Sequence, residues 1–225
     1  MSASEQKPST LAIAPHGALC LAGANSLAAR ARTDLRNREE AEEWLRKGLE
    51  FKETSHSEEA FKCFEQGIRV SPNDPELQYQ IGSAFHSGTG AGKLLAKALS
   101  WYRMAAEQGH ADAQFLLVGF YDRSRVQALA WLRMAAEQGY LMAQYSMCNI
   151  YGYGVNYGQS WDHDVPRDYM EACFWRELII LDWKKCEMRG EYVNEFLAKL
   201  SPDEQGIVKV RAAESFASHQ PGRRE

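Results

Sequence analysis

The sequence predicts an all-α protein and, within that class, a right-handed α-solenoid of antiparallel helix pairs. The main evidence is an internal repeat. The segments WYRMAAEQGHADAQF (101–115) and WLRMAAEQGYLMAQY (131–145) agree at ten of fifteen positions. Small and large apolar residues fall at helical spacing within each segment, and glycine and proline clusters separate the segments. Repeats of this length are typical of folds in which helix pairs stack in a row.

The repeat extends beyond these two segments. A glutamine followed seven residues later by an aromatic residue occurs three times, as Gln78 and Phe85, Gln114 and Tyr121, and Gln144 and Tyr151. The steps between the glutamines are 36 and 30 residues. Each unit therefore has room for two helices of ordinary length.

The breaks between helices can be placed in order along the chain. Residues 1–25 are predicted to form a flexible tail, and residues 25–43 a lead-in helix whose alternating Arg and Glu face solvent. Asp74 before Pro75 is a good N-cap for a new helix. The glycines over 88–92 predict a loop between two helices. Residues 156–165 interrupt the last repeat and are predicted to project as a loop.

Two helices are predicted to close the C-terminal side of the stack. Residues 187–200 have helical periodicity, and Ser201 and Glu204 around Pro202 form a capping box for the next helix. We expect this last helix to bury Ile207 and Val210, with Ala213 beside them. Terminal helices with a polar outer face keep a stack of repeats soluble.

These motifs resemble two related families of helical repeats. The signature of the tetratricopeptide repeat is matched by Trp44, Gly48, Phe51, Ala60, Phe64 and Pro72. From Leu77 onward, the two AAEQG segments and the AQF and AQY segments resemble SEL-1-like repeats. Val118 and Cys148 depart from that pattern because they replace a glycine.

The resemblance implies a division of the chain into five parts. These are a tail and lead-in helix (1–38), a tetratricopeptide-type repeat (39–74), three SEL-1-like repeats (75–182), capping helices (183–217) and a final tail (218–225). It also implies a protein-interaction scaffold whose first helices line a concave groove.

Composition restricts the partners and the compartment. A net charge of −4 and a pI near 5.9 argue against a nucleic acid as the main partner, because phosphate binding requires a basic surface. No apolar run is long enough to cross a membrane. Five cysteines at irregular spacing, without a CxxC pair, indicate free thiols and a cytoplasmic protein. The alternative is export, if the apolar stretch 11–24 acts as a signal segment.

The motifs of enzymes and metal sites are incomplete in this sequence. The glycine-rich stretch 87–93 lacks a preceding strand, and Leu94 stands where a phosphate-binding loop requires Ser or Thr. Ser4 and Lys7 fit a penicillin-recognising pattern without its companion motifs. The cluster from Asp162 to Asp164 is interpreted as a solvated loop, since a metal site needs further ligands. We therefore predict no enzymatic activity, no cofactor and no metal.

The predicted function is to bind a peptide or a helix in the concave groove. Helical spacing places seven candidate residues on that face, namely Tyr79, Ser83, His86, Phe115, Tyr145, Asn149 and Tyr153. An aromatic-lined groove with polar edges suits such a partner. Two alternatives stay open: the aromatics pack neighbouring helices together, or the chain is a hydrolase of β-lactams. The sequence predicts neither the partner nor the oligomeric state.

Overall fold

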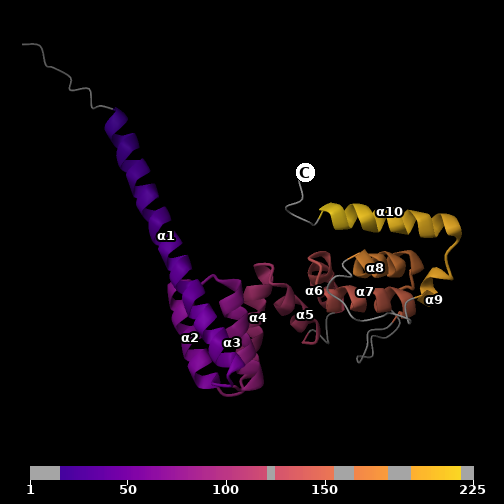
Figure 1. The fold of residues 1–225 in the computed structure, drawn as a ribbon, viewed down its shortest axis with the longest axis horizontal. Helices are drawn as coiled ribbons and strands as arrows, with labels where there is room; N and C mark the ends of the chain where they lie inside the picture. The colour runs from indigo at the N-terminus through magenta and orange to yellow at the C-terminus, as the bar shows by residue number, and fades with distance from the viewer. Residues whose placement is uncertain (1–15, 121–124, 155–164, 182–193, 219–225) are drawn as a thin grey trace, which may run out of the picture.

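The computed structural model describes residues 16–120, 125–154, 165–181 and 194–218. Within these residues the chain forms ten helices and no strand (Figure 1). The helices are α1 (His16–Glu53), α2 (Ser57–Val70), α3 (Pro75–Ser87), α4 (Leu95–Glu107), α5 (Ala111–Val118), α6 (Arg125–Glu137), α7 (Leu141–Tyr153), α8 (Tyr169–Leu181), α9 (Asn194–Leu197) and α10 (Pro202–Ser218).

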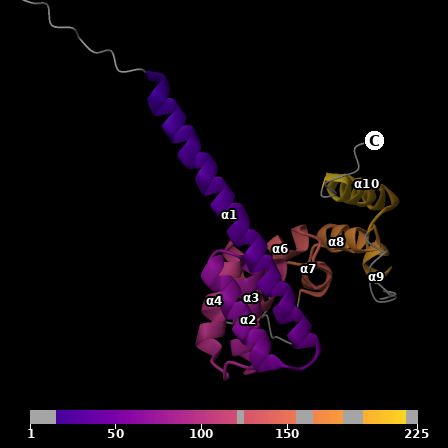
Figure 2. The same cartoon turned by 60° about the vertical axis from the view of Figure 1, so that its left-hand side comes forward.

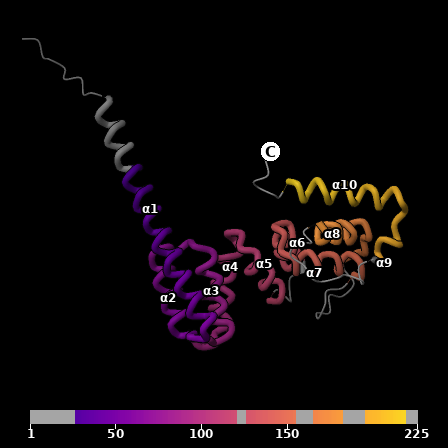
Figure 3. Tube along the Cα trace, viewed as in Figure 1, coloured from indigo at the N-terminus to yellow at the C-terminus, as the bar shows by residue number. Residues whose placement is uncertain are grey.

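The helices pack in sequential pairs: α1 with α2, α3 with α4, α5 with α6, and α7 with α8. Each pair also contacts the next one, so the pairs form a row (Figure 3). We call the first helix of each pair the A helix and the second the B helix. The arrangement confirms the predicted fold class, an all-α solenoid of antiparallel helix pairs.

In the first two pairs, a glycine on the A helix faces an aromatic ring on the B helix, because the two helices approach closely. Gly48 of α1 lies against the ring of Phe64 in α2, and a β-carbon on Gly48 would collide with that ring. The next pair repeats the arrangement, since a β-carbon on Gly82 would lie 2.8 Å from Cδ1 of Tyr102. At the same repeat position α5 carries Val118, which is buried. The third pair thus has a larger residue where the first two need glycine.

Alanines form the closest contacts of the repeat core. Ala105 and Ala106 of α4 have no exposed surface, and neither have Ala135 and Ala136 of α6. These alanines come from the two AAEQG segments. The repeated motif is therefore explained by the space available, because a longer side chain would overpack these positions.

The two glutamines of each repeat pair with each other. Gln108 at the end of α4 donates from Nε2 to Oε1 of Gln78 in α3, at 2.7 Å. Gln138 at the end of α6 donates in the same way to Gln114 of α5, also at 2.7 Å. Gln114 in turn donates to the carbonyl of Ala106 in the preceding unit, at 3.0 Å. The buried amide of Gln114 thus joins two consecutive units of this glutamine ladder.

The ladder lacks one donor at the fourth pair. Gln144 of α7 donates to the carbonyl of Ala136 at 3.1 Å, but its buried Oε1 has no donor among the described residues. The position equivalent to Gln108 and Gln138 is Asp182. It lies outside the described residues, and a carboxylate cannot donate as an amide does.

The C-terminal helix confirms the predicted cap and corrects the predicted face. The backbone N–H of Ser201 donates to Oε2 of Glu204 at 2.8 Å, and the backbone N–H of Glu204 donates to Oγ of Ser201 at 3.4 Å, as the capping box requires. The expected burial of Ile207, Val210 and Ala213 is wrong, since all three are exposed. Val208 and Ala212 are buried instead, and Phe216 packs beside them. Two faces of α10 carry apolar residues, and helical periodicity alone does not say which one packs against α8.

The N-terminal side also differs from the expected tail. α1 begins at His16, inside the tail predicted over residues 1–25, and continues without a break to Glu53. Its first part projects beyond the row of helix pairs (Figures 1 and 2). Residues 27–36 are exposed on every side of the helix.

Several predictions concern residues that the structure does not describe or does not test. The insertion at 156–165, with Trp161, lies outside the described residues except for Val165, and so does Cys186. The side chain of Cys20, in the first turns of α1, is not described. The predicted unit boundaries stay a prediction. No helix among the described residues is long and apolar enough to cross a membrane.

Candidate functional site

Three aromatic residues occupy one repeat position on successive A helices. Tyr79 lies on α3, Phe115 on α5 and Tyr145 on α7, and each directly follows a ladder glutamine. All three side chains are partly buried. We call them the aromatic stripe.

Two members of the stripe pack against the N-terminus of the next A helix. Tyr79 stacks on the imidazole of His110, with ring centroids 4.5 Å apart and planes at 18°. Phe115 packs on Tyr140 with centroids 5.2 Å apart. His110 and Tyr140 are the N-caps of α5 and α7, so they are equivalent positions of the repeat. The stripe therefore helps to join units, and its remaining surface is accessible.

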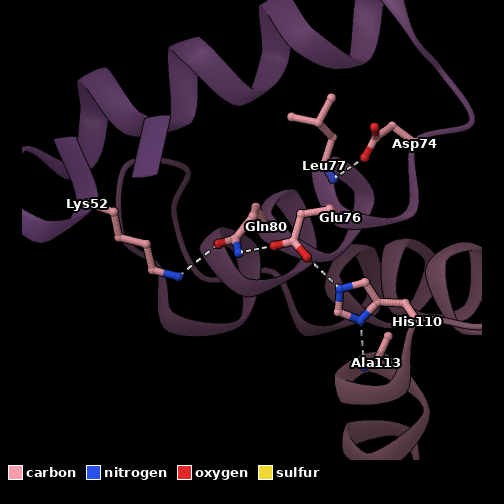
Figure 4. Close-up of polar contacts among 7 residues, drawn as sticks. All are labelled: Lys52, Asp74, Glu76, Leu77, Gln80, His110 and Ala113. Atoms are coloured by element: carbon pink, nitrogen blue, oxygen red, sulfur yellow. Dashed lines mark hydrogen bonds and ion pairs between the residues drawn. The ribbon is translucent and has the colours of Figure 1, made fainter. Parts of the chain in front are cut away.

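A chain of polar contacts runs beside the stripe from the first unit to the third (Figure 4). Nε2 of His110 donates to Oε2 of Glu76 at 2.9 Å, and Nδ1 of His110 accepts from the backbone N–H of Ala113 at 3.3 Å. Gln80 donates to Oε1 of Glu76 at 2.6 Å and accepts from Nζ of Lys52 at 2.8 Å. These bonds assign His110 the neutral tautomer with its proton on Nε2.

The start of α3 determines where Glu76 points. Oδ1 of Asp74 accepts from the N–H of Leu77 at 2.9 Å, which confirms the N-cap predicted from the sequence. Pro75 occupies the first turn, where its missing N–H costs nothing. Glu76 follows in that turn, near the positive end of the helix dipole. The sequence therefore fixes this carboxylate at the boundary with the next unit.

Burial and nearby charges set the protonation of the site. The hydrogen bond from His110 is the main reason that the pKa of Glu76 lies below its usual value. Burial raises the pKa of Tyr140 to about 12, and the carboxylate of Asp112 adds to that effect. The pKa of Tyr79 is raised by burial first and then by Asp112. Both phenols therefore stay neutral and act as hydrogen-bond donors at neutral pH.

Ser83 and His86 lie one and two turns farther along α3 and are partly buried. Nδ1 of His86 lies 3.3 Å from the hydroxyl of Tyr102, and its ring packs edge-on against Phe120. Burial raises the pKa of Tyr102 to about 12, while a hydrogen bond with Ser83 acts in the opposite direction. These two candidates thus contact the neighbouring B helix and the end of α5.

The two remaining candidates on α7 have structural contacts. Asn149 is buried, contrary to its expected position on an open groove, and its Nδ2 has no partner among the described residues. Tyr153 donates a short hydrogen bond to Glu195 of α9 and packs edge-on against Phe196. A β-carbon on Gly152 would collide with the same Phe196 ring. This end of α7 is therefore occupied by the C-terminal helices.

Sequence reasoning missed three residues of the site. His110 and Tyr140 follow Gly109 and Gly139 at equivalent positions, so the repeat itself marks them. Their contacts with the stripe depend on how the units stack. Glu76 carries no motif, and only the fold shows that it faces His110.

A separate hollow of about 410 Å³ lies among α2, α3 and α4. Its lining combines apolar rings and chains with three charged groups, and consists of Phe61, Glu65, Ile68, Arg69, Ile81, Phe85, Lys97 and Trp101. Two of the three helices are B helices, so this hollow provides a comparison surface for tests of the stripe.

The cysteine thiols of the described residues are buried. Cys63, Cys148 and Cys173 are free, buried thiols, and burial raises the pKa of Cys148 to about 12 and that of Cys173 to about 11. Such thiols are poor nucleophiles. No group of three or more potential metal ligands occurs in the described part of the chain. Ser4 and the Asp162–Asp164 cluster lie outside it.

Comparison with known proteins links the repeats to one family. The sequence model of the Sel1 repeat matches residues 34–50, 75–110, 112–140 and 141–177, which together make up more than half of the chain. No curated protein sequence matches the chain.

Two solved structures are similar in part. One is a Sel1 repeat protein from Oxalobacter formigenes, with 24% identity over 70% of this chain and 62% of its own, at a TM-score of 0.48. The other is a protective antigen present in uropathogenic Escherichia coli strains that displays an SLR fold, with 20% identity over 74% of this chain and 52% of its own, at a TM-score of 0.29. The present chain thus spans less than two thirds of the length of either protein.

Proposed function

The chain belongs to the Sel1 repeat family, and from this premise we propose that it is a non-catalytic scaffold that binds a protein or peptide along its A helices. The observation that carries the proposal is the aromatic stripe of Tyr79, Phe115 and Tyr145. Stacked units bring the same position of each A helix into one line. The stripe thereby offers a row of aromatic surfaces to an extended peptide or a helix.

The surroundings of the stripe favour a particular kind of ligand. The phenol of Tyr79 is a neutral donor, while Glu76 and Asp112 supply negative charge beside it. The Glu76 side chain keeps 41% of its surface exposed. A peptide with aliphatic or aromatic anchors and neighbouring Lys or Arg fits this combination. The acidic setting is unfavourable for a nucleic acid.

Packing at the stripe supports recognition by a surface that is already formed. The stack of Tyr79 on His110 and the bonds from His110 to Glu76 hold the rings before any partner arrives. Fewer side chains then have to be ordered on binding, and the entropic cost falls. The contacts that join the units and the proposed binding role are thus compatible.

The test uses a peptide selected from a random display library on the immobilised full chain. The dissociation constant of that peptide is then measured for the wild type, Phe115→Ala and Phe61→Ala. Both substitutions remove a partly buried phenyl ring, but Phe61 lies on α2 beside the separate hollow. Phe115→Ala is expected to weaken binding by about tenfold or more, because buried aromatics dominate interface energies.

Thermal unfolding of both variants serves as the control. The proposal requires that Phe61→Ala, with a comparable loss of melting temperature, keeps the affinity of the wild type. It fails if affinity follows melting temperature in both variants. It also fails if Phe61→Ala alone abolishes binding, since the hollow among α2, α3 and α4 would then be the binding surface.

A further inference from the structure

The projecting part of α1 carries apolar residues that are exposed in the described structure. Leu27 is 66% exposed and Leu35 is 56% exposed, and Ala28 and Ala31 lie exposed between them. From His16 to Arg36 the helix would be about 30 Å long, at 1.5 Å per residue. In proteins, most of the stability of a helix comes from packing of one face against other elements rather than from helix propensity. Exposed leucines on such an arm therefore indicate a surface that is covered by another element.

The outer face of α10 has the same property. Ile207 and Val210 are each 59% exposed, and Ala217 is exposed one turn or more beyond them. With Asp203 and Glu214 they follow the spacing of one helix face, at 203, 207, 210, 214 and 217. A helix that closes a stack of repeats normally turns a polar face outward. The opposite face of α10 already packs on α8 through Val208.

These two faces lie at opposite ends of the row of helix pairs (Figures 1 and 3). We infer that the projecting arm of α1 in one copy packs on the outer face of α10 in a second copy, so that copies join head to tail. This inference concerns the ends of the solenoid and is independent of the function proposed for the aromatic stripe.

The charges of the two faces are complementary. Residues 27–38 contain four arginines and one aspartate, whereas the outer face of α10 carries Asp203 and Glu214. The basic residues nearest to it on α10 include Arg211, which pairs with Glu171 at 2.7 Å and stacks on Phe174 instead. The arm is therefore basic and its docking face acidic.

An antiparallel register brings the apolar residues together and pairs opposite charges at one end. Placing Leu35 beside Ile207 also places Ala31 beside Val210, because both helices repeat their faces every three to four residues. In this register Arg38 comes next to Asp203, at one end of the apolar contact. Glu214, at the other end, lies opposite Leu27 and Ala28.

Head-to-tail contact of this kind is heterologous, because each copy contributes a different surface. Such contacts build rings when the rotation closes and open chains when it does not. A single contact between two helices is smaller than a standard interface of about 1,600 Å², so weak association, on the order of micromolar, is expected. The charged pairs are solvent-exposed, and salt should weaken the association.

The experiment is sedimentation velocity of the full chain at concentrations up to several hundred micromolar, with two variants. Leu35→Glu disables the arm and leaves α10 intact, while Val210→Glu disables α10 and leaves the arm intact. Both residues are exposed in the single chain, so folding is expected to be unchanged, and melting temperature checks this. The wild type is expected to associate, and each variant alone to stay monomeric.

The mixture of the two variants distinguishes the possible geometries. One intact arm and one intact α10 face remain, so the mixture is expected to form a dimer and nothing larger. A wild type that stays monomeric at the highest concentration overturns the inference, as does a mixture that stays monomeric. If Val210→Glu alone dimerises, arms pair with arms; if Leu35→Glu alone dimerises, α10 pairs with α10. Either result also overturns it.

Charge reversal tests the register. Arg38→Glu and Asp203→Arg are each expected to weaken self-association by about tenfold, as like charges meet across the contact. The double variant carries both changes and should recover most of the lost affinity. A double variant as weak as the single ones would exclude the antiparallel register.

Discussion

The imidazole of His110 hydrogen bonds to the carboxylate of Glu76, with 2.9 Å between Nε2 and Oε2, across the boundary of two repeat units. The same ring caps α5 through the N–H of Ala113 and stacks on Tyr79 of α3. One side chain thus connects the cap of an A helix, a carboxylate of the preceding unit and the aromatic stripe. Any change at this ring should affect both stability and the candidate site.

The first prediction concerns acid. Because its folded-state pKa is lowered, mainly by the bond from His110, Glu76 stabilises the fold above the ordinary pKa of a glutamate. That stabilisation should be lost as the pH falls through the lowered value. The difference in melting temperature between the wild type and Glu76→Gln should therefore shrink as the pH is lowered from neutral to about 3. Thermal unfolding followed by circular dichroism over this range measures it.

The matched control for this prediction is Glu59→Gln on α2, a residue that is exposed in the described part of the chain. Its difference from the wild type should stay small and nearly constant with pH. A constant difference for Glu76→Gln would show that the bond to His110 does not contribute to stability.

The second prediction concerns the glutamine ladder. Gln138 is exposed, and substitution of an exposed residue usually changes stability little. Its Nε2, however, is the donor to Oε1 of the fully buried Gln114. Gln138→Ala leaves this oxygen unpaired, so unfolding in urea should show a loss of about 1–3 kcal/mol. Glu137→Ala, one residue earlier on the same helix, should change stability by less than about 0.5 kcal/mol.

Most of the fold could be predicted from the sequence because small residues recur at the positions where the helices of each repeat approach most closely. Ala105 and Ala135 mark the closest helix contacts, and a repeated motif fixes the register of both. Asp74 and Ser201 mark helix starts through local hydrogen bonds, which depend only on nearby residues. Local rules of this kind can be applied without knowing the fold.

The predictions that were wrong concern contacts that depend on how two elements pack against each other. α10 has apolar residues at both 207 and 208, and which of them is buried depends on how α8 presents its surface. In the candidate site, the repeat predicts the position of the stripe on each A helix. It does not predict the contact of Tyr79 with His110, because that contact joins units whose relative rotation is a property of the whole stack.

The third prediction tests the repeat core. Ala135 has no exposed surface at the contact between α6 and its neighbours, so Ala135→Leu should overpack it and destabilise the fold by about 1–3 kcal/mol. Ala130 lies exposed on the same helix, and Ala130→Leu should be nearly neutral, since both residues favour helix. Equal effects of the two substitutions would mean that the packed face of α6 has been assigned wrongly.

The last prediction separates the structural role of the stripe from its proposed role in binding. The stack of Tyr79 on His110 should appear as a coupling in a double-mutant cycle of Tyr79→Ala and His110→Ala, measured by urea unfolding. Aromatic pairs contribute about 0.5–1.5 kcal/mol beyond the area they bury, and a coupling of that size is expected. The loss of the bond to Glu76 occurs in both His110 variants and therefore cancels in the cycle. Tyr145→Ala with His110→Ala provides the reference, because Tyr145 lies on α7 and should combine additively within about 0.5 kcal/mol. If the first cycle shows no coupling, the rings of Tyr79 and His110 do not support each other, and the stripe does not depend on the next unit for its position.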